Sequence, residues 1–345
     1  MKSLLVLGKG DTTYSDRNRK RVITFAQNMG IDVKTADYHE LDTVSDFKTD
    51  KINVMFFFPF TFWNNNCETP KDTKLYGTSK SSYTLFRDFF INIKTELEDK
   101  FGAKRLNFII EPEKAAIDRD KLKTVEILRD YNIPTTETLE YYSIQDLIDR
   151  VSNTRAIFIK CRYGAEGKGI TVMHRKKWVT NYKVEKGKLI NYKLNGLWPF
   201  TDITGQKSLI YQLLEQDVIV ELEILTPKIY NNKFDVRAYS IGNKAPHFFI
   251  RLNEPVKEIT NFSQGGKVIH HPYTTLSEHT QFLIKKITLE TANAIGLKFV
   301  GVDIMFDKKL TNPKVVELQA FTDFPSIIYF DLAEYMIKDE VGLLI

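Results

Sequence analysis

The sequence predicts a mixed α/β protein, in which a doubly wound domain with a parallel sheet is followed by a region of α+β character. Apolar strands alternate with helical segments over residues 1–105, and the strand expected at Ile52–Phe60 is apolar at almost every position. From residue 112 onward, short strands and glycine-containing turns replace that alternation. Alternating strands and helices are typical of a doubly wound sheet, and a continuous apolar run indicates a strand buried on both faces of a parallel sheet.

The N-terminal domain is expected to contain two helices between its strands. The helix expected at Asp16–Met29 is followed by Gly30, which suits a helix end, and the helix expected at Thr84–Lys100 has apolar residues at helical spacing. The strands are expected at Leu4–Leu7, Ile31–Thr35, Ile52–Phe60 and Leu106–Ile110. Ligands usually bind at the carboxyl ends of such strands. The loops Gly8–Asp16 and Thr61–Thr78 are therefore candidate binding segments, and the second is long enough to be either functional or mobile.

The rest of the chain is expected to combine short strands with fewer helices. A helix should run from Asp118 or Asp120 to Tyr131 and end before Pro134, because the residue before a proline tends to leave the helical region. A second helix, Ser277–Ile295, has Ser277 as its N-cap and Gly296 after it. The strands are expected at Ala156–Lys160, Ile170–Met173, Val218–Ile224, Phe234–Ile241, Pro246–Leu252, Phe299–Phe306 and Lys314–Leu318.

Two segments of this second region are harder to place. The basic, polar stretch 174–206 is expected to form an inserted hairpin or an exposed flap. Residues 325–345 should form a last helix and an apolar tail, Val341–Ile345, which packs within the chain or in a homodimer.

Composition excludes several classes of protein. The chain of 345 residues has 49 Lys and Arg against 44 Asp and Glu, a net charge of +5 that is spread along the sequence. This argues against a nucleic-acid binder with a basic face, and no apolar run is long enough to span a membrane. Cys67 and Cys161 are the only cysteines, which excludes a disulfide scaffold and a thiolate zinc site and suits the reducing cytosol.

Three oxygen-bearing side chains are expected on one face of the C-terminal strands. Glu317 and Gln319 are two residues apart on a strand and point the same way, and Asp303 lies on the preceding strand. Hard cations such as Mg²⁺ prefer such ligands. The alternative is that these are ordinary carboxylates facing solvent, but their apolar neighbours indicate buried strands, where a carboxylate needs a partner.

A glycine loop between two strands is a candidate phosphate site. Lys160 ends one strand, and Gly164, Gly167 and Gly169 follow before Ile170 begins the next. Glycines let backbone N–H groups approach an anion, and lysine adds a positive charge suited to phosphate. The pattern matches neither a P-loop nor a dinucleotide fingerprint, since no helix follows. The alternative is a flexible hairpin turn.

Other polar motifs are ambiguous when each is taken singly. Asp235 and Arg237 share one strand face, where the guanidinium could hold a phosphoryl group or substrate carboxylate, or could simply form a structural ion pair. Asn261 begins another glycine loop with Arg251 upstream, and Lys121 is an ordinary helix-start residue. The pair His270-His271 suggests a zinc half-site, but a loop pair without a metal is the favoured interpretation.

Taken in order, these motifs resemble those of the ATP-grasp superfamily of carboxylate–amine ligases. The order is Asp120-Lys121, Lys160 with the three glycines, Asp235-x-Arg237, Asn261 with Gly265-Gly266, Asp303, and Glu317-x-Gln319. The pattern is similar to that of RimK-like glutamate ligases and glutathione synthetase, and the sequence around Arg237 also resembles tubulin tyrosine ligase-like enzymes. The resemblance covers residues 106–330.

The resemblance implies an ATP-grasp fold with three units and two cofactors. The units are an N-terminal α/β substrate domain at 1–111, a central lid domain at 112–217 and a C-terminal catalytic domain at 218–345, with ATP gripped between the last two. The cofactors implied are ATP and Mg²⁺, with Mn²⁺ as an alternative metal.

The resemblance also implies roles for individual residues. Those expected to contact ATP are Lys121, Lys160, Gly164, Gly167, Gly169, Glu221, Leu222 and Glu223. Those expected to hold Mg²⁺ are Asp303, Glu317 and Gln319, where the family usually has asparagine in place of Gln319. Those expected to face the reacting group are Arg237, Arg251 and Asn261.

The activity implied is amide formation through an acyl phosphate, in which ATP phosphorylates a carboxylate and an amine then displaces phosphate. The alternatives are a kinase that phosphorylates a hydroxyl and an ATP-binding regulatory protein without turnover. The substrate could be a small metabolite, an amino acid or a peptide. Its pocket is expected to be shaped by Arg17, Trp63 and Asn64–Asn66.

Overall fold

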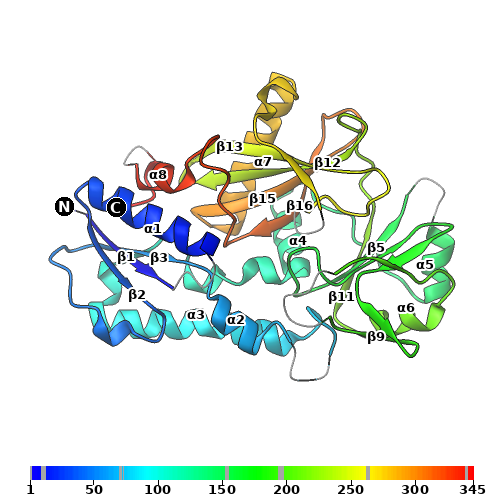
Figure 1. The fold of residues 1–345 in the computed structure, drawn as a ribbon, viewed down its shortest axis with the longest axis horizontal. Helices are drawn as coiled ribbons and strands as arrows, with labels where there is room; N and C mark the ends of the chain where they lie inside the picture. Colours follow the sequence, from blue (N-terminus) through cyan, green and yellow to red (C-terminus); the bar gives the residue numbers. More distant parts are fainter. Residues whose placement is uncertain are drawn as a thin grey trace.

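The described part of the chain folds around three large β-sheets, two of which share a core, and one two-stranded hairpin. The computed structural model describes residues 2–8, 13–69, 72, 74–151, 155–192, 198–261, 265–338 and 341–345, with the side chains of 13–15 excepted. Within that part, the N-terminal sheet lies beside the C-terminal sheet, and the central sheet stands apart at the other end of the molecule (Figure 1).

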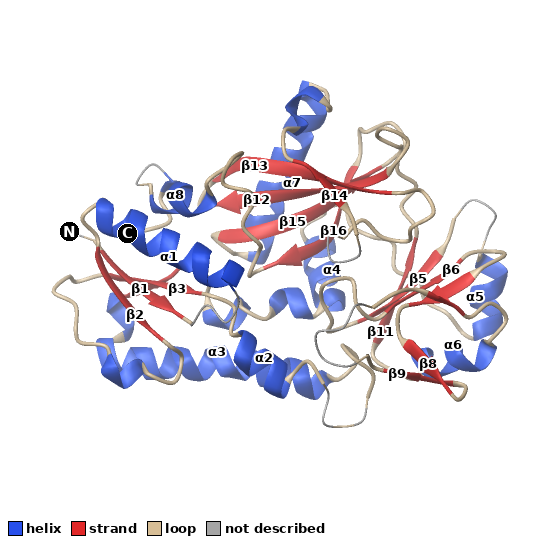
Figure 2. Cartoon of the chain, in the orientation of Figure 1, coloured by secondary structure: helices blue, strands red, loops and turns tan. Residues whose placement is uncertain are grey.

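The N-terminal sheet is parallel, which confirms the doubly wound prediction. Its order is β2-β1-β3-β4, and every pairing in it is parallel. The strands are β1 (Ser3–Leu7), β2 (Asp32–Ala36), β3 (Ile52–Phe56) and β4 (Leu106–Phe108). All residues of β1 are buried, as expected for a strand covered on both faces. The helices α1 (Thr13–Asn28) and α3 (Lys80–Phe101) lie on opposite sides of this sheet (Figure 2).

Two expected loops of this domain are partly helical. Strand β3 ends at Phe56, before Pro59, which has no N–H to continue a sheet ladder, and α2 (Phe60–Asn66) occupies the start of the expected loop Thr61–Thr78. Helix α1 begins at Thr13, so most of Gly8–Asp16 that remains as loop lies outside the described residues.

The central sheet is antiparallel and has its own apolar core. Its order is β10-β7-β6-β5-β11. The strands are β5 (Ile157–Cys161), β6 (Ile170–Met173), β7 (Trp178–Thr180), β10 (Thr201–Asp202) and β11 (Val218–Leu222). Helices α5 (Ile144–Arg150) and α6 (Lys207–Leu214) contribute to that core. Because β11 pairs with β5, the domain boundary expected between residues 217 and 218 falls inside this sheet.

The stretch 174–206 is not an exposed flap in its described part. It supplies β7 and β10 to the central sheet and forms the hairpin of β8 (Lys183–Glu185) and β9 (Lys188–Ile190). Trp178, Tyr182 and Trp198 are buried. The segment is basic overall, but its large aromatic side chains bury apolar area that no exposed flap could cover. Residues 193–197 lie outside the described part.

The C-terminal sheet is antiparallel with the order β14-β13-β12-β15-β16. Its strands are β12 (Lys233–Ile241), β13 (Lys244–Asn253), β14 (Lys267–Ile269), β15 (Phe299–Phe306) and β16 (Pro313–Gln319). Helix α7 (Glu278–Ile295) packs on it, capped as predicted by the Ser277 side chain and ended by Gly296 in the left-handed conformation. Helix α4 (Lys121–Asp130), capped by Asp120, packs against α7.

The apolar tail packs within the chain. Helix α8 (Leu332–Ile337) lies beside α1 (Figure 1), and Val341, Leu343 and Leu344 are buried. The Ile345 backbone N–H donates to Asn53 Oδ1 at 2.9 Å, and Asn53 Nδ2 donates to the Ile345 carbonyl at 3.0 Å. The tail thereby joins the core shared by the N- and C-terminal sheets.

Short 3-10 turns connect several elements, at Leu41–Thr43, Ala103–Arg105, Pro112–Lys114, Ile117–Arg119 and Pro272–Thr274. In the described part of the chain, no helix combines the length and apolarity needed to cross a membrane.

Candidate functional site

A cavity of about 280 Å³ lies between the central sheet and the C-terminal sheet, and most of the sequence-predicted site residues line it. The predicted residues on its wall are Lys121, Lys160, Gly167, Glu221, Leu222, Glu223, Arg251, Asn261, Asp303 and Glu317. Lys160 and Asp303, which are far apart in sequence and lie on different sheets, therefore face one space. We call this space the inter-sheet cavity.

Lys160 enters the cavity from β5 and is held by a buried carboxylate. Its Nζ lies 2.6 Å from Glu221 Oε2, and Glu221 Oε1 accepts a hydrogen bond from Thr136 Oγ1 at 2.7 Å. Burial disfavours the charged ammonium, but Glu221 outweighs burial and the pKa of Lys160 is raised above its usual value. The Glu221 carboxylate thus favours the charged form of this lysine on the central-sheet side of the cavity.

Lys121 brings a second positive charge from the first turn of α4. Its Nζ lies 3.2 Å from Glu317 Oε1 on β16 and donates a hydrogen bond to the Gly164 carbonyl in the glycine loop. The ammonium therefore connects the C-terminal sheet with the loop that joins β5 to β6.

The glycine loop packs closely against the segment Tyr76–Gly77. A Cβ added to Gly164 would lie 2.2 Å from Cys161 Sγ, so no larger residue fits there without a shift. The Ala165 N–H donates to the Tyr76 hydroxyl at 3.1 Å. Gly164 therefore has a packing role that is independent of any ligand, which the phosphate interpretation had not included. Gly167, with a φ of +68°, has the left-handed backbone that favours glycine.

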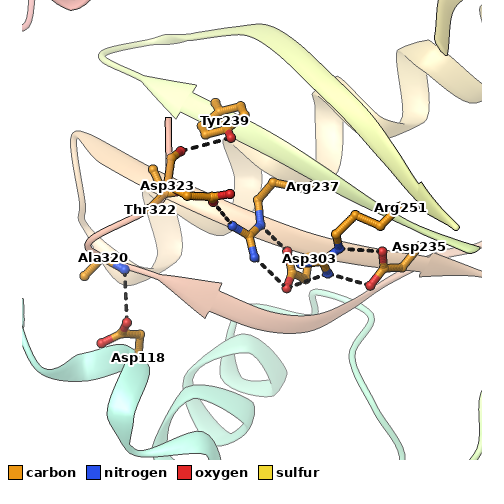
Figure 3. A network of polar contacts seen from close by, with 9 residues as sticks. All are labelled: Asp118, Asp235, Arg237, Tyr239, Arg251, Asp303, Ala320, Thr322 and Asp323. Carbon is orange, nitrogen blue, oxygen red and sulfur yellow. Dashed lines mark hydrogen bonds and ion pairs between the residues drawn. The ribbon is translucent and has the colours of Figure 1, made fainter. Parts of the chain in front are cut away.

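Asp303 is the centre of a buried ionic network on the C-terminal sheet (Figure 3). Arg237 stands opposite it on β12 and donates from both Nε and Nη2, the latter at 3.1 Å. Arg251 Nη2 lies 2.8 Å from Asp303 Oδ2, and the same guanidinium pairs with Asp235 at 2.7 and 2.5 Å. Burial raises the pKa of a carboxyl, but the two arginines outweigh it and hold the pKa of Asp303 below its usual value.

The three predicted metal ligands share a sheet face but divide between two cavities. Asp303 pairs in register with Glu317, and Gly301 pairs with Gln319. The register shifts after Asp303, which leaves Val316 without a cross-strand partner, and such bulges often occur beside active sites. Asp303 and Glu317 line the inter-sheet cavity, whereas Gln319 borders an adjoining one.

The donor chemistry of the two carboxylates fits Mg²⁺, which is commonly bound by one or two carboxylates with water and phosphate completing its shell. Glu317 is the more available donor, because its ion pair within the described chain is with Lys121 alone. Asp303 already accepts from two guanidinium groups. In the described residues, no group of three or more His, Cys, Asp or Glu side chains is arranged for a metal ion, and His270 instead stacks on Tyr329 at 4.4 Å.

The adjoining cavity has a volume of about 720 Å³ and lies between the N-terminal and C-terminal sheets. It shares Ala165, Lys168, Arg251 and Asn261 with the inter-sheet cavity, so the two spaces meet at these residues. Arg237 and Gln319 line it. We call this space the acceptor cavity.

The residues expected to shape a substrate pocket are only partly together. Trp63 and Asn64 line the acceptor cavity, whereas Arg17 lines a separate surface pocket with Lys20 and Arg21 on α1. Arg17 lies on α1, within the helix expected at Asp16–Met29, and it lines that separate pocket rather than the cavity of Trp63 and Asn64.

Sequence reasoning missed a polar chain that joins the two cavities. Lys168, from the glycine loop, lies 2.7 Å from Glu68 Oε1, and the Trp63 indole N–H donates to Glu68 Oε2 at 2.6 Å. Burial disfavours the charged form of Lys168, but the carboxylates of Glu166 and Glu68 outweigh burial, so its pKa is raised above the usual value. The lysine between Gly167 and Gly169 was the available signal, but nothing in the sequence identifies Glu68 as its partner.

Comparison with known proteins identifies this arrangement of sheets as an ATP-grasp fold. The chain belongs to the YheC/D-like ATP-grasp family, whose model matches residues 118–311. No curated protein matches the sequence.

Several solved structures share the fold over nearly the whole chain. ATP-grasp ligase PsnB complexed with a minimal precursor is 14% identical, with a TM-score of 0.57 and 99% of each chain covered. D-cycloserine synthetase DcsG is 12% identical, with a TM-score of 0.56 and 99% of each chain covered. D-alanine–D-alanine ligase from Bacillus anthracis is 11% identical, with a TM-score of 0.56, covering 99% of this chain and 98% of that one. At these identities the likeness establishes the fold.

Proposed function

We propose that the protein is an ATP- and Mg²⁺-dependent carboxylate–amine ligase that forms an amide through an acyl phosphate. The observation that carries this proposal is the inter-sheet cavity, where Lys160 from the central sheet, Lys121 from α4 and Arg251 from the C-terminal sheet face the carboxylates of Asp303 and Glu317. Three cations and two potential metal ligands around one space suit a bound triphosphate.

Each residue that lines the inter-sheet cavity has a role set by its position. Lys121 and Lys160 hold ATP phosphates from two sides, and the loop containing Gly164, Gly167 and Gly169 covers them. Segment 221–223 borders the cavity where the adenine and ribose would lie, with Glu221 also orienting Lys160. Mg²⁺ held by Glu317 and Asp303, with Gln319 as a third oxygen donor, would supply positive charge at the phosphate oxygens.

The junction between the two cavities is where we place the transfer step. Arg251 and Asn261 line both spaces. A carboxylate in the acceptor cavity can therefore meet the terminal phosphate there, with Arg251, and Arg237 on the acceptor side, neutralising developing charge. The carboxylate oxygen attacks phosphorus and ADP leaves; the amine then attacks the acyl carbon and phosphate leaves. The glycine loop excludes water from the acyl phosphate.

The structural relatives support a ligase over the alternatives. PsnB is described as an ATP-grasp ligase complexed with a precursor, and DcsG and the Bacillus anthracis enzyme as a synthetase and a ligase. A peptide or amino-acid substrate is therefore our first choice for this chain.

The test supplies ATP and Mg²⁺ with pooled amino acids and peptides. The expected result is a product whose mass equals two substrates minus water, with ADP and inorganic phosphate released in equal amounts. The variant Glu317→Gln should form no product. The matched variant Glu290→Gln changes an exposed residue of α7 that is not among those lining the cavity, and it should behave as wild type. Phosphate retained on the product would establish a kinase, and ATP binding without turnover across all acceptors would establish a regulatory protein.

A further inference from the structure

The acceptor cavity is mainly apolar. Its walls include Phe56, Phe58, Trp63, Ile110, Phe321 and Phe324. A volume of about 720 Å³ is within the range of small-molecule sites. Because aromatic and aliphatic walls gain most by contact with apolar groups, the body of the ligand should be apolar. A small, wholly polar metabolite would leave these walls against water.

One cation in this cavity has no carboxylate within hydrogen-bond distance among the described residues. Arg119, in the turn before α4, has a side chain that is 11% exposed, and its Cζ lies 5.0 Å from the Trp63 ring centroid and 5.3 Å from that of Phe58. Its ion pair within the described chain is with Asp118 at 3.7 Å, longer than a hydrogen bond, and its Nε has no hydrogen-bond partner among the described residues. A buried cation of this kind needs an anion.

A second donor in the same cavity also lacks a partner. Asn18, on α1, is 3% exposed and lines the acceptor cavity. Its Nδ2 has no hydrogen-bond partner within the described part of the chain. A buried amide donor without a partner costs free energy unless a ligand or water accepts its hydrogen bond. Asn18 and Arg119 come from different elements, so the cavity contains two independent unsatisfied donors.

The cations on the cavity wall differ in how closely they are paired. They are Arg119, Lys168, Arg237 and Arg251. Lys168, Arg237 and Arg251 each have a carboxylate within 2.8 Å, from Glu68, Asp303 and Asp235 respectively. The Asp118 carboxylate lies 3.7 Å from Arg119, so Arg119 is the cation of this wall best able to take a ligand carboxylate.

We infer that the acceptor cavity binds an amino acid or peptide end with an aromatic or branched apolar side chain, whose unreacted carboxylate is held by Arg119 with help from Asn18. This inference rests on the proposed ligase function and names the substrate class of its second site. A planar guanidinium binds a carboxylate through two parallel hydrogen bonds, and the aromatic wall around it provides the apolar contact. Arg119 is thus a specificity-determining residue for the acceptor.

The test measures binding without turnover, by calorimetry on the full chain with phenylalanine, leucine, serine and glutamate as probes, with and without ATP and Mg²⁺. Phenylalaninamide is the matched probe because it lacks the carboxylate. We expect phenylalanine and leucine to bind about ten- to a hundredfold more tightly than serine, glutamate or phenylalaninamide. The dipeptide Gly-Phe and a longer peptide ending in Phe distinguish a free amino acid from a peptide end.

The variants separate recognition from folding. Arg119→Met keeps an apolar stem against the rings and removes the charge. Because it also leaves the buried Asp118 carboxylate without its ion-pair partner, its melting temperature should fall, and Asp118→Asn is measured beside it as the control for that loss. Arg119→Met should abolish the preference for the carboxylate over the amide and leave ATP affinity unchanged, whereas Asp118→Asn should keep the preference. Arg119→Lys should restore part of the preference, and Asn18→Ala should weaken it.

The outcomes are distinguishable from failure of the ligase proposal. Carboxylate-dependent binding of the apolar probes that is lost in Arg119→Met supports the inference, even if no amide is formed. Amide formation with unchanged probe preference in Arg119→Met overturns the inference and leaves the ligase proposal standing. Binding of no probe, amino acid or peptide, or equal binding of polar and apolar probes, also overturns it.

Discussion

Replacing Asp303 by asparagine should destabilise the protein far more than an ordinary carboxylate substitution. The carboxylate accepts from Arg237 and Arg251 in a site where its side chain and that of Arg237 are each only 3% exposed. The asparagine side chain would keep the shape and lose the charge. Two guanidinium groups would then remain on one sheet face with a neutral group between them.

The expected cost follows from what remains paired. Removing one partner of a buried ion pair costs about 3–5 kcal/mol. Here Arg251 keeps Asp235 and Arg237 keeps Asp323, so we expect the lower end, about 3 kcal/mol. If the unit with the shared core unfolds together, this corresponds to a decrease in Tm of roughly 6–12 °C.

The pH dependence follows from the sign of the pKa shift. Because the pKa of Asp303 is lowered in the folded protein, its contribution is present above the ordinary value of 3.8 and is lost as pH falls through the folded pKa. The Tm difference between wild type and Asp303→Asn should therefore be constant from about pH 5 to pH 8 and shrink only in strong acid.

The assay is thermal unfolding without nucleotide at several pH values, with Glu290→Gln as the control. Glu290 pairs with Lys286 at 3.8 Å on the exposed face of α7, and loss of such a pair costs at most about 0.5 kcal/mol. Asp303→Asn should also lack ATP turnover. If its Tm lies within about 1 °C of the control, the network does not contribute as described and the argument from burial is wrong.

Three further changes test other parts of the structure. Burial, with His270 and His271, lowers the pKa of His247 from 6.5 to about 4. The unfolded state then binds the proton more tightly, so the free energy of unfolding should fall by about 3 kcal/mol between pH 7.5 and pH 4. His247→Leu should reduce this fall, as measured by urea titration at the two pH values. Glu68→Gln should weaken the contact with Lys168, which would appear as faster hydrogen exchange in the glycine loop and a raised KM for ATP. Unchanged exchange would contradict the idea that the Glu68–Lys168 contact holds this loop over the phosphates. Gly301→Ala would place a Cβ 2.3 Å from Thr322 Oγ1 and should cost about 1–3 kcal/mol in unfolding experiments.

Much of the fold could be predicted because its signals are local. Apolar strands and a capped helix such as Ser277–Ile295 depend on nearby residues, and the structure confirms them. The placement of Asp303 and Glu317 on one face followed from the two-residue period of a strand and a short connection. The helices α5 and α6 were missed, although Ser143 as N-cap of α5 was a readable signal.

The pairing of charges could not be predicted in the same way. Arg237 lies opposite Asp303 only because β12 and β15 are adjacent in that register. The number of residues between the two strands does not reveal which strands pair or in which register. The exposed-flap alternative for 174–206 was wrong for a related reason, although that segment does contain the hairpin of β8 and β9. Its basic residues dominate the composition, whereas the burial of Trp178 and Tyr182 in the apolar core of the central sheet depends on contacts with distant segments.

The distribution of the cores bears on how the protein could open. The N- and C-terminal sheets share one apolar core and are joined by the tail, so they form a single frame. The central sheet is built on separate cores, to which Tyr76 of the segment before α3 also contributes. Two stretches of backbone, residues 131–143 and 223–232, connect the central unit to that frame. We expect nucleotide entry to turn the central unit about these two stretches. Most of the wall of the acceptor cavity belongs to the frame. Its shape should therefore persist whether the central unit is turned towards the frame or away from it.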